Sequence, residues 1–125
     1  MSTPFTISGT LSLPPDDGLP VAAITKAQSL TFDKLQETVF SLTGTGTQDV
    51  DLGSIASPGC KAMLISVDTG STVQPVLVKL NGASQGIELS AGGFMLFSNP
   101  NPAAGITTLA LTYTSACKVR VWALG

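Results

Sequence analysis

The sequence predicts an all-β protein, a single β-sandwich or jelly-roll-like domain of about eight strands with an extended N-terminal arm. Its composition is the first reason, because Thr (15 residues), Ser (13), Gly (13) and Pro (8) are typical of strand-rich chains with many turns. Strand-like runs recur after residue 36 at intervals of about 8–12 residues, the spacing of a sandwich or barrel. No window of about 12 residues shows convincing helical periodicity.

The N-terminal part of the chain differs from the rest. The first strand-like run spans residues 5–13, and its alternating apolar positions share one side of a strand: Phe5, Ile7, Leu11 and Leu13. Pro and Gly then make up four of the seven residues from Pro14 to Pro20. The segment from Pro14 to about Leu35 is a surface loop, or an arm that orders against a neighbouring subunit while the first strand pairs with another chain or a sheet edge. We therefore divide the chain into an arm, residues 1–35, and a β-sandwich domain, residues 36–125.

The remaining strands are expected within residues 36–125. The run 61–67 is almost continuously apolar, which suits a central strand. Asn81–Gly82 predicts a hairpin turn, because both central residues of a type I′ turn need positive φ. Residues 30–40 are the best helical candidate. β-branched residues interrupt the helical pattern there, so this segment could hold one short helical turn. The expected strands are 38–43, 48–52, 61–67, 76–80, 86–89, 94–97, 107–113 and 117–124.

The composition excludes several kinds of chemistry. The chain has no histidine, so Ser-His-Asp and Cys-His catalytic pairs and His-ligated zinc sites are excluded. The six basic residues stand singly in a chain of net charge −2, so we expect no nucleic-acid partner. The longest apolar stretches have about four residues, against roughly 20 for a transmembrane helix. With no secretory signal at the N-terminus, we expect synthesis in a cytoplasm and no membrane partner.

Two kinds of polar motif are candidate sites. Asp16–Asp17 and the pair Asp49 and Asp51 are the close acidic pairs. Asp49 and Asp51 suit a calcium ion or the carboxylates of a glycosidase, but without an EF-hand pattern or an aromatic platform a solvated strand face is the simpler interpretation. The glycine-rich segments 44–46 and 92–93 predict turns, since neither opens a helix or carries a phosphate-loop lysine. We therefore predict no catalytic, metal-binding or cofactor-binding residue, and no enzyme.

The two cysteines leave two alternatives open. Cys60 and Cys117 cannot complete a tetrahedral metal site by themselves. They are either free, small core residues or a disulfide, which a reducing cytoplasm disfavours.

The surplus of apolar residues predicts protein partners. Charged residues make up 11% of the chain, against about 25% in a typical soluble domain. Mean hydropathy is +0.38, and exposed apolar patches usually mark interfaces. Trp122 shares a strand face with Lys118 and Arg120, and we expect the strand that carries it to be held in a sheet or an interface. The predicted interface residues, in a homo-oligomer, are Phe5, Ile7, Leu11, Leu13, Phe94, Phe97 and Trp122.

The layout resembles small virion structural proteins of tailed bacteriophages. The resemblance is one of composition and layout, and it extends over most of the chain. No functional residue can be carried over from it. It implies a capsid decoration (cement) protein, often a trimer, that bridges neighbouring major capsid proteins and resists internal DNA pressure in the virion. The segments that prompt it are 40–47, 51–54, 88–100 and 119–125.

Other functions remain as alternatives. A receptor- or carbohydrate-binding jelly-roll module of a tail tip or fibre would use Trp122 to stack on a sugar, although the chain has a single Trp and a single Tyr. A neck or head-completion protein would be distinguished by its ring symmetry. A hydrolase is the least favoured, because of the missing catalytic residues.

Overall fold

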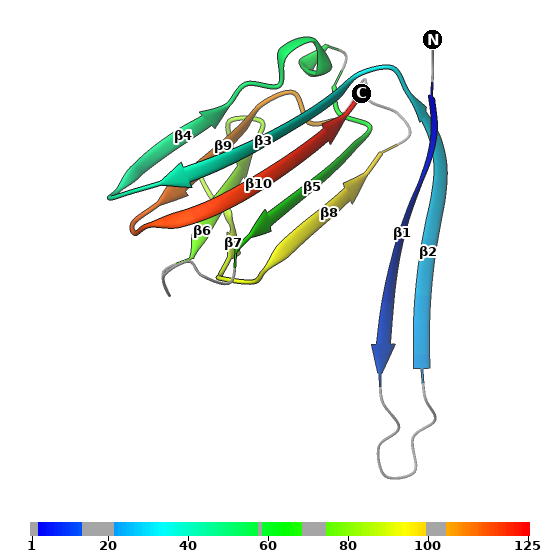
Figure 1. Cartoon of the computed structure of the whole chain (residues 1–125), viewed down its shortest axis with the longest axis horizontal. Helices are drawn as coiled ribbons and strands as arrows, with labels where there is room; N and C mark the ends of the chain where they lie inside the picture. Colours follow the sequence, from blue (N-terminus) through cyan, green and yellow to red (C-terminus); the bar gives the residue numbers. More distant parts are fainter. Residues whose placement is uncertain (1–2, 14–21, 58, 69–74, 100–104) are drawn as a thin grey trace.

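The described part of the chain is built of antiparallel β-sheets, so the all-β prediction is confirmed (Figure 1). The computed structural model describes residues 3–13, 22–57, 59–68, 75–99 and 105–125. These residues form one two-stranded sheet, β1-β2, and two four-stranded sheets, β3-β10-β5-β8 and β4-β9-β6-β7. The strands are β1 (Thr3–Leu13), β2 (Ala22–Phe32), β3 (Leu35–Leu42), β4 (Gly46–Val50), β5 (Ala62–Val67), β6 (Val76–Leu80), β7 (Ile87–Leu89), β8 (Phe94–Ser98), β9 (Leu109–Tyr113) and β10 (Cys117–Leu124).

Helical structure is minimal in these residues. A 3₁₀ turn, η1 (Gly53–Ala56), follows β4. No helix in the described segments is long and apolar enough to cross a membrane.

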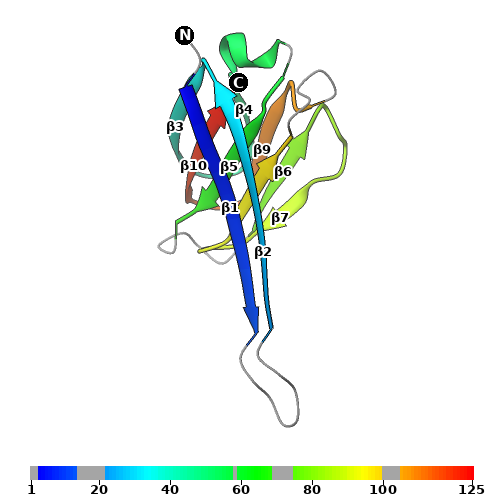
Figure 2. The ribbon, with the colours of Figure 1, turned by 90° about the vertical axis from the view of Figure 1, so that its right-hand side faces the viewer.

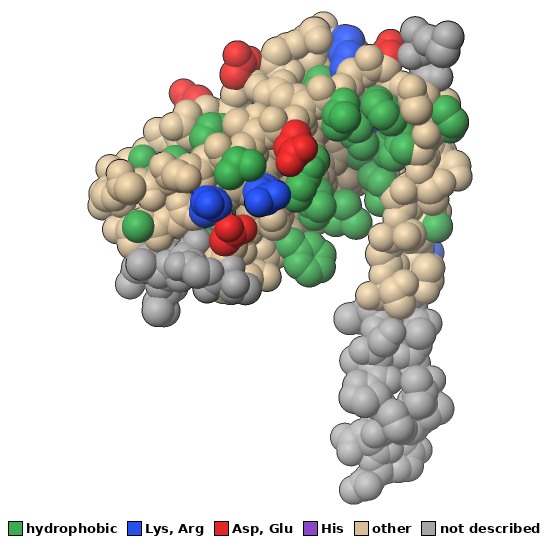
Figure 3. All heavy atoms as spheres, viewed as in Figure 1, with side chains coloured by type: hydrophobic (Ala, Val, Ile, Leu, Met, Phe, Trp, Pro, Cys, Tyr) green, Lys and Arg blue, Asp and Glu red, His purple; other side chains and the backbone are tan. Residues whose placement is uncertain are grey.

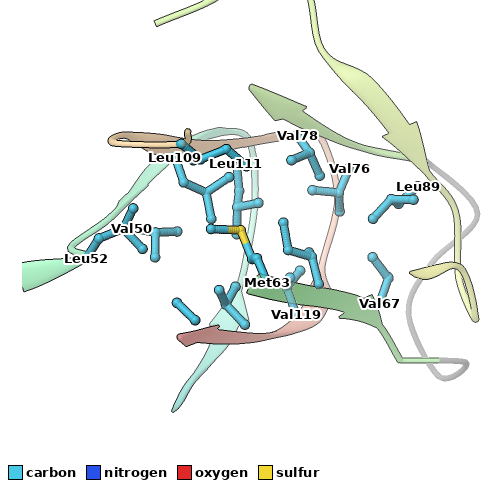
Figure 4. Close-up of a cluster of buried hydrophobic side chains, with 14 of the residues drawn as sticks. Val50, Leu52, Met63, Val67, Val76, Val78, Leu89, Leu109, Leu111 and Val119 are labelled. Atoms are coloured by element: carbon cyan, nitrogen blue, oxygen red, sulfur yellow. The ribbon is translucent and has the colours of Figure 1, made fainter. Parts of the chain in front are cut away.

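The two four-stranded sheets face each other across one apolar core. Strand β10 shows how the sequence dictates this, because Val119 and Val121 are buried while Lys118 and Arg120 alternate with them and are exposed. Figure 4 shows Met63 and Val119 from one sheet opposite Val78 and Leu111 from the other. No polar or charged residue is buried among those described, so hydrophobic burial dominates the packing of the body.

Two local predictions are confirmed. Strand β5 lies between β10 and β8, the interior position that its apolar run favoured. Asn81 and Gly82 have φ of 53° and 72°, and the N–H of Ala83 donates to the carbonyl of Leu80 at 3.1 Å. This closes the tight turn after β6, and strand β7 then pairs with β6.

The N-terminal prediction needs a correction. Strand β1 pairs with β2 along its whole length, from Thr3 opposite Phe32 to Leu13 opposite Ala22. Residues 22–32 are therefore a strand and not a loop, and β1 pairs within its own chain. Residues 30–40 contain the end of β2 and the start of β3 rather than a helical turn. The Pro-rich residues 14–21, with Asp16–Asp17, lie outside the described residues.

The β1–β2 hairpin lies on the β8 side of the body, and the distal ends of its strands extend past it (Figures 1 and 2). Its base is held by the end of β10 and by β5. The Gly125 carbonyl accepts hydrogen bonds from the N–H groups of Asp33 and Lys34, at 3.0 and 3.1 Å. The Lys61 ammonium, just before β5, donates to the carbonyl of Thr31 at 2.8 Å.

Candidate protein-binding surface

The sheet β3-β10-β5-β8 carries an apolar row on the side away from the core. Trp122 on β10 pairs with Leu64 on β5, and Leu64 pairs with Leu96 on β8. Residues directly opposite each other on one face of an antiparallel pair lie close enough for their side chains to pack. The row therefore forms one apolar strip across three strands, and Leu96 at its end is 41% exposed.

Further apolar side chains lie at both edges of this sheet. Phe94, on edge strand β8, is 68% exposed, and Leu35 and Val39 on edge strand β3 are also exposed. We call the strip and these edge residues the outer face: Leu35, Val39, Leu64, Phe94, Leu96 and Trp122. Charged side chains share this face, because Arg120 lies between Val39 and Ser66, and Glu37 on β3 lies opposite Trp122. The apolar strip across β10, β5 and β8 is the part of the outer face that is typical of an interaction surface.

The β1–β2 hairpin overhangs part of the outer face. Phe5 packs edge-on against Phe32 across the two strands, with ring centroids 5.3 Å apart. Phe5 and Ile7 then form one wall of a groove of about 360 Å³, whose other wall includes Leu64, Leu96 and Trp122. Figure 3 shows apolar side chains gathered between the sheet and the hairpin. We call this the hairpin groove.

A second groove of about 390 Å³ shares Ile7 and Leu96 with the first and follows the hairpin outward. Its lining becomes more polar, with Lys26, Gln28 and Ser98. A hydrogen bond between the Ser98 hydroxyl and the Gln28 side-chain oxygen joins β8 to β2.

The opposite side of the hairpin is rich in hydroxyl groups. Thr10 and Thr25 share a hydrogen bond at 3.1 Å, and Thr6 and Ser29 share one at 3.5 Å. The hairpin is therefore amphipathic near its base, with its apolar side toward the body.

The structure brings together three of the seven predicted interface residues. Phe5, Ile7 and Trp122 line the hairpin groove. Phe94 lies apart from them, at the exposed edge of the outer face. Phe97 differs from expectation, because β8 alternates and Phe97 packs against the core. The side chains of Leu11 and Leu13 lie outside the described residues.

Sequence reasoning missed Leu64, Leu96, Leu35 and Val39. Leu64 lies in a run that is apolar on both faces, so alternation carried no signal there. Strict alternation in Phe94–Phe97 places Phe94 and Leu96 on one face and Met95 and Phe97 on the other. Alternation within residues 94–97 was therefore the sequence feature that could have identified Leu96 as an exposed residue.

The acidic pair has a local structural role. Asp51 Oδ1 accepts a hydrogen bond from the N–H of Gly53 at 2.8 Å, at the entry to η1. Asp49 and Asp51 are exposed, as a solvated surface requires. No group of three or more metal-ligating side chains occurs among the described residues, so no observation favours the calcium alternative.

The cysteines are free and buried, which resolves the alternatives left open by the sequence. Desolvation by burial raises the pKa of Cys60 to about 11 and also raises the pKa of Cys117. A thiol with a raised pKa holds little thiolate at neutral pH and is a poor nucleophile. Both cysteines therefore act as core residues.

Comparison with known proteins finds no matching family model, no matching curated protein and no matching solved structure.

Proposed function

We propose that the two four-stranded sheets form a jelly roll. Counted from β3, the eight strands of the body have the order first, eighth, third, sixth in one sheet and second, seventh, fourth, fifth in the other. Two Greek keys wrapped into a double sheet have this order, and the jelly roll occurs in viral capsid proteins and lectins.

On this fold, we propose that the chain is a virion structural protein of a tailed bacteriophage. It would act as a capsid decoration protein that binds the major capsid protein as a homo-oligomer, with a trimer favoured. The observation that carries this proposal is the apolar strip Trp122–Leu64–Leu96 on the outer face, beside the β1–β2 hairpin. Its mechanism is burial of apolar surface, with no chemical step.

The copy number in the virion tests this proposal. Gel densitometry of purified particles should show the chain in a fixed, high ratio to the major capsid protein. Particles from a phage that lacks the gene should release DNA at a lower temperature, and added purified chain should restore their stability. A few copies per particle would contradict the proposal and indicate a neck, head-completion or tail protein.

A carbohydrate-binding role is the second candidate, and Trp122 is the observation that favours it. Its side chain lines the hairpin groove, and lectins share the jelly roll. Binding to a glycan array that is lost on Trp122→Ala, but kept on Ile87→Ala in the opposite sheet, would support this role. No binding to any glycan would remove it.

A further inference from the structure

The β1–β2 hairpin contributes no buried side chain to the apolar core. Every described side chain of β1 and β2, in residues 3–10 and 25–32, is exposed or only partly buried. In the body, every strand except β8 contains a buried side chain, and β8 packs Met95 and Phe97 against the core. Segments with few buried apolar contacts open locally, at a lower free energy than global unfolding. The hairpin is therefore the described element that can leave its place while the core stays intact.

The contacts between the hairpin and the body involve side chains rather than strand pairing. Strands β1 and β2 form a sheet of their own, and no backbone hydrogen bond joins them to another strand within the described residues. The Lys61 ammonium donates to the Thr31 carbonyl at 2.8 Å, and the Ser98 hydroxyl bonds to the Gln28 side-chain oxygen. Apolar packing across the hairpin groove adds to these bonds.

The chain passes from the hairpin to the body through Asp33 and Lys34, and the body fixes these two residues in place. Their N–H groups donate to the Gly125 carbonyl at 3.0 and 3.1 Å, and the Gly125 N–H donates to the Lys34 carbonyl at 2.9 Å. The Lys34 ammonium donates to the carbonyl of Ser54 at 2.9 Å. The point about which the hairpin can turn is therefore anchored by backbone bonds that the strands beyond it lack.

The hairpin covers part of the apolar strip. Leu64 and Trp122 line the hairpin groove, and they are partly buried although they lie on the outward side of the sheet. Phe94, on the same side of the sheet but outside that groove, is 68% exposed. Rotation of the hairpin away from the sheet would therefore expose Leu64 and Trp122, together with the apolar side of the hairpin itself.

We propose that the β1–β2 hairpin is a hinged cover of the strip Trp122–Leu64–Leu96, and that it rotates about Asp33 and Lys34 while the body stays folded. Hinges are typically a few residues between elements that absorb the change in backbone conformation. A partner that binds the uncovered strip would hold the hairpin open, since a ligand shifts the population toward the state that binds it. This inference deepens the proposed function, on which it rests for the identity of the partner, because it states how access to the strip is controlled.

Amide hydrogen exchange of the free chain, followed by mass spectrometry, tests the opening without capsid shells. In the locked chain, Gln28→Cys and Ser98→Cys are bridged by dibromobimane, because these two side chains already share a hydrogen bond. The matched control bridges Thr47→Cys to Thr112→Cys, whose hydroxyls lie 3.2 Å apart within the other four-stranded sheet. The two native cysteines are buried and thus shielded from the reagent.

In the unmodified chain, we expect the amides of β1 and β2 to exchange at least about tenfold faster than those of β10, because a detached two-stranded hairpin is marginally stable. They should still exchange more slowly than the amides of an unstructured peptide. The lock should slow the exchange of the hairpin at least about tenfold and reduce acrylamide quenching of Trp122, the single tryptophan. The control bridge should change neither.

Three results would overturn the proposal. The first is equal exchange in the hairpin and β10, which would mean that the hairpin opens only when the body unfolds. The second is exchange of the hairpin at the rate of an unstructured peptide, which would mean that it does not cover the strip. The third is a lock that acts no differently from the control bridge.

Binding to capsid shells separates this inference from the proposed function. The locked chain should bind shells at least about tenfold more weakly than the control-bridged chain, because the strip stays covered. Equal binding of the two bridged chains would overturn the role of the hairpin as a cover. Absence of binding by the unmodified chain would instead contradict the proposed function, and the exchange rates would still decide whether the hairpin opens.

Discussion

The side-chain oxygen of Asn81 accepts a hydrogen bond from the backbone N–H of Thr107 at 2.8 Å, although the residues are 26 positions apart. The same oxygen accepts from the Thr107 hydroxyl at 3.2 Å, and the Asn81 amide donates to the carbonyl of Gly105 at 3.2 Å. Asn81 also holds the left-handed backbone of the β6–β7 turn. Asn81 thus adopts the backbone conformation that the turn requires, and its side chain bonds the turn to the segment before β9.

This double role predicts a graded mutant series. Asn81→Ala should lower the free energy of unfolding by about 2 kcal/mol, because it loses the hydrogen bonds and places a Cβ-bearing residue without a polar side chain at positive φ. Asn81→Gly keeps the backbone free, so its loss should be about 1 kcal/mol. Urea denaturation measures both. Equal losses for the two variants would show that the backbone conformation contributes nothing.

The core predicts a contrast between two apolar residues on the same sheet. Leu111 on β9 is fully buried, and Leu111→Ala should cost about 2–5 kcal/mol of unfolding free energy through lost burial and the cavity left behind. Ile87→Ala on β7 should change it by less than about 0.5 kcal/mol, because that side chain is half exposed. Urea denaturation of the two variants in parallel checks this, and similar losses would place the core elsewhere.

Two glycines should respond in opposite directions to alanine. A Cβ at Gly86 would lie 2.8 Å from Leu77 Cβ and 3.3 Å from Leu77 backbone atoms, so Gly86→Ala should cost about 1–3 kcal/mol as the strands shift. A Cβ at Gly9 would meet Leu96 at an ordinary 3.9 Å. Gly9→Ala should therefore stabilise the hairpin by about 0.5 kcal/mol, because it restricts the unfolded chain. Urea denaturation measures the first change, and amide hydrogen exchange in β1 and β2 measures the second. Faster amide exchange in Gly9→Ala would show that a Cβ does not fit between Gly9 and Leu96, and it would contradict the position of the hairpin beside β8.

The buried thiol of Cys60 predicts a pH dependence of stability. Its pKa rises from 9.0, the value for an unburied thiol, to about 11 in the folded chain. Between these values the unfolded chain has released the proton and the folded chain still holds it, so the free energy of unfolding should fall as pH rises from about 9 to about 11. Cys60→Ala removes this group and should flatten the fall. Urea midpoints measured from pH 8 to pH 11 check this, and an unchanged slope in Cys60→Ala would assign the fall to other groups.

Much of the body was predictable because local signals agreed with the tertiary structure. The run 117–124 alternates strictly, and its buried side is Cys117, Val119 and Val121, as the pattern predicted. Asn81–Gly82 forms the expected turn because few residue pairs accept positive φ twice. In both cases the physical cause lies within a few neighbouring residues.

Strand β2 was not predictable in the same way. Ala22, Lys26, Ala27 and Gln28 have weak strand propensity, so the run resembled a loop. The segment becomes a strand because β1 pairs with it from end to end. The pairing is a contact between distant positions, and the local sequence does not encode it.

The sequence by itself determined the all-β class, the alternation that separates the core from the surface, and the shortage of charge that pointed to protein partners. Only the tertiary structure decided that Phe97 packs against the core, that Leu64 and Leu96 join Trp122 in one strip, and that Phe5 and Ile7 wall a groove above it. The physical reason is register, because alternation assigns a side chain to a face, but pairing between strands decides which side chains become neighbours on that face.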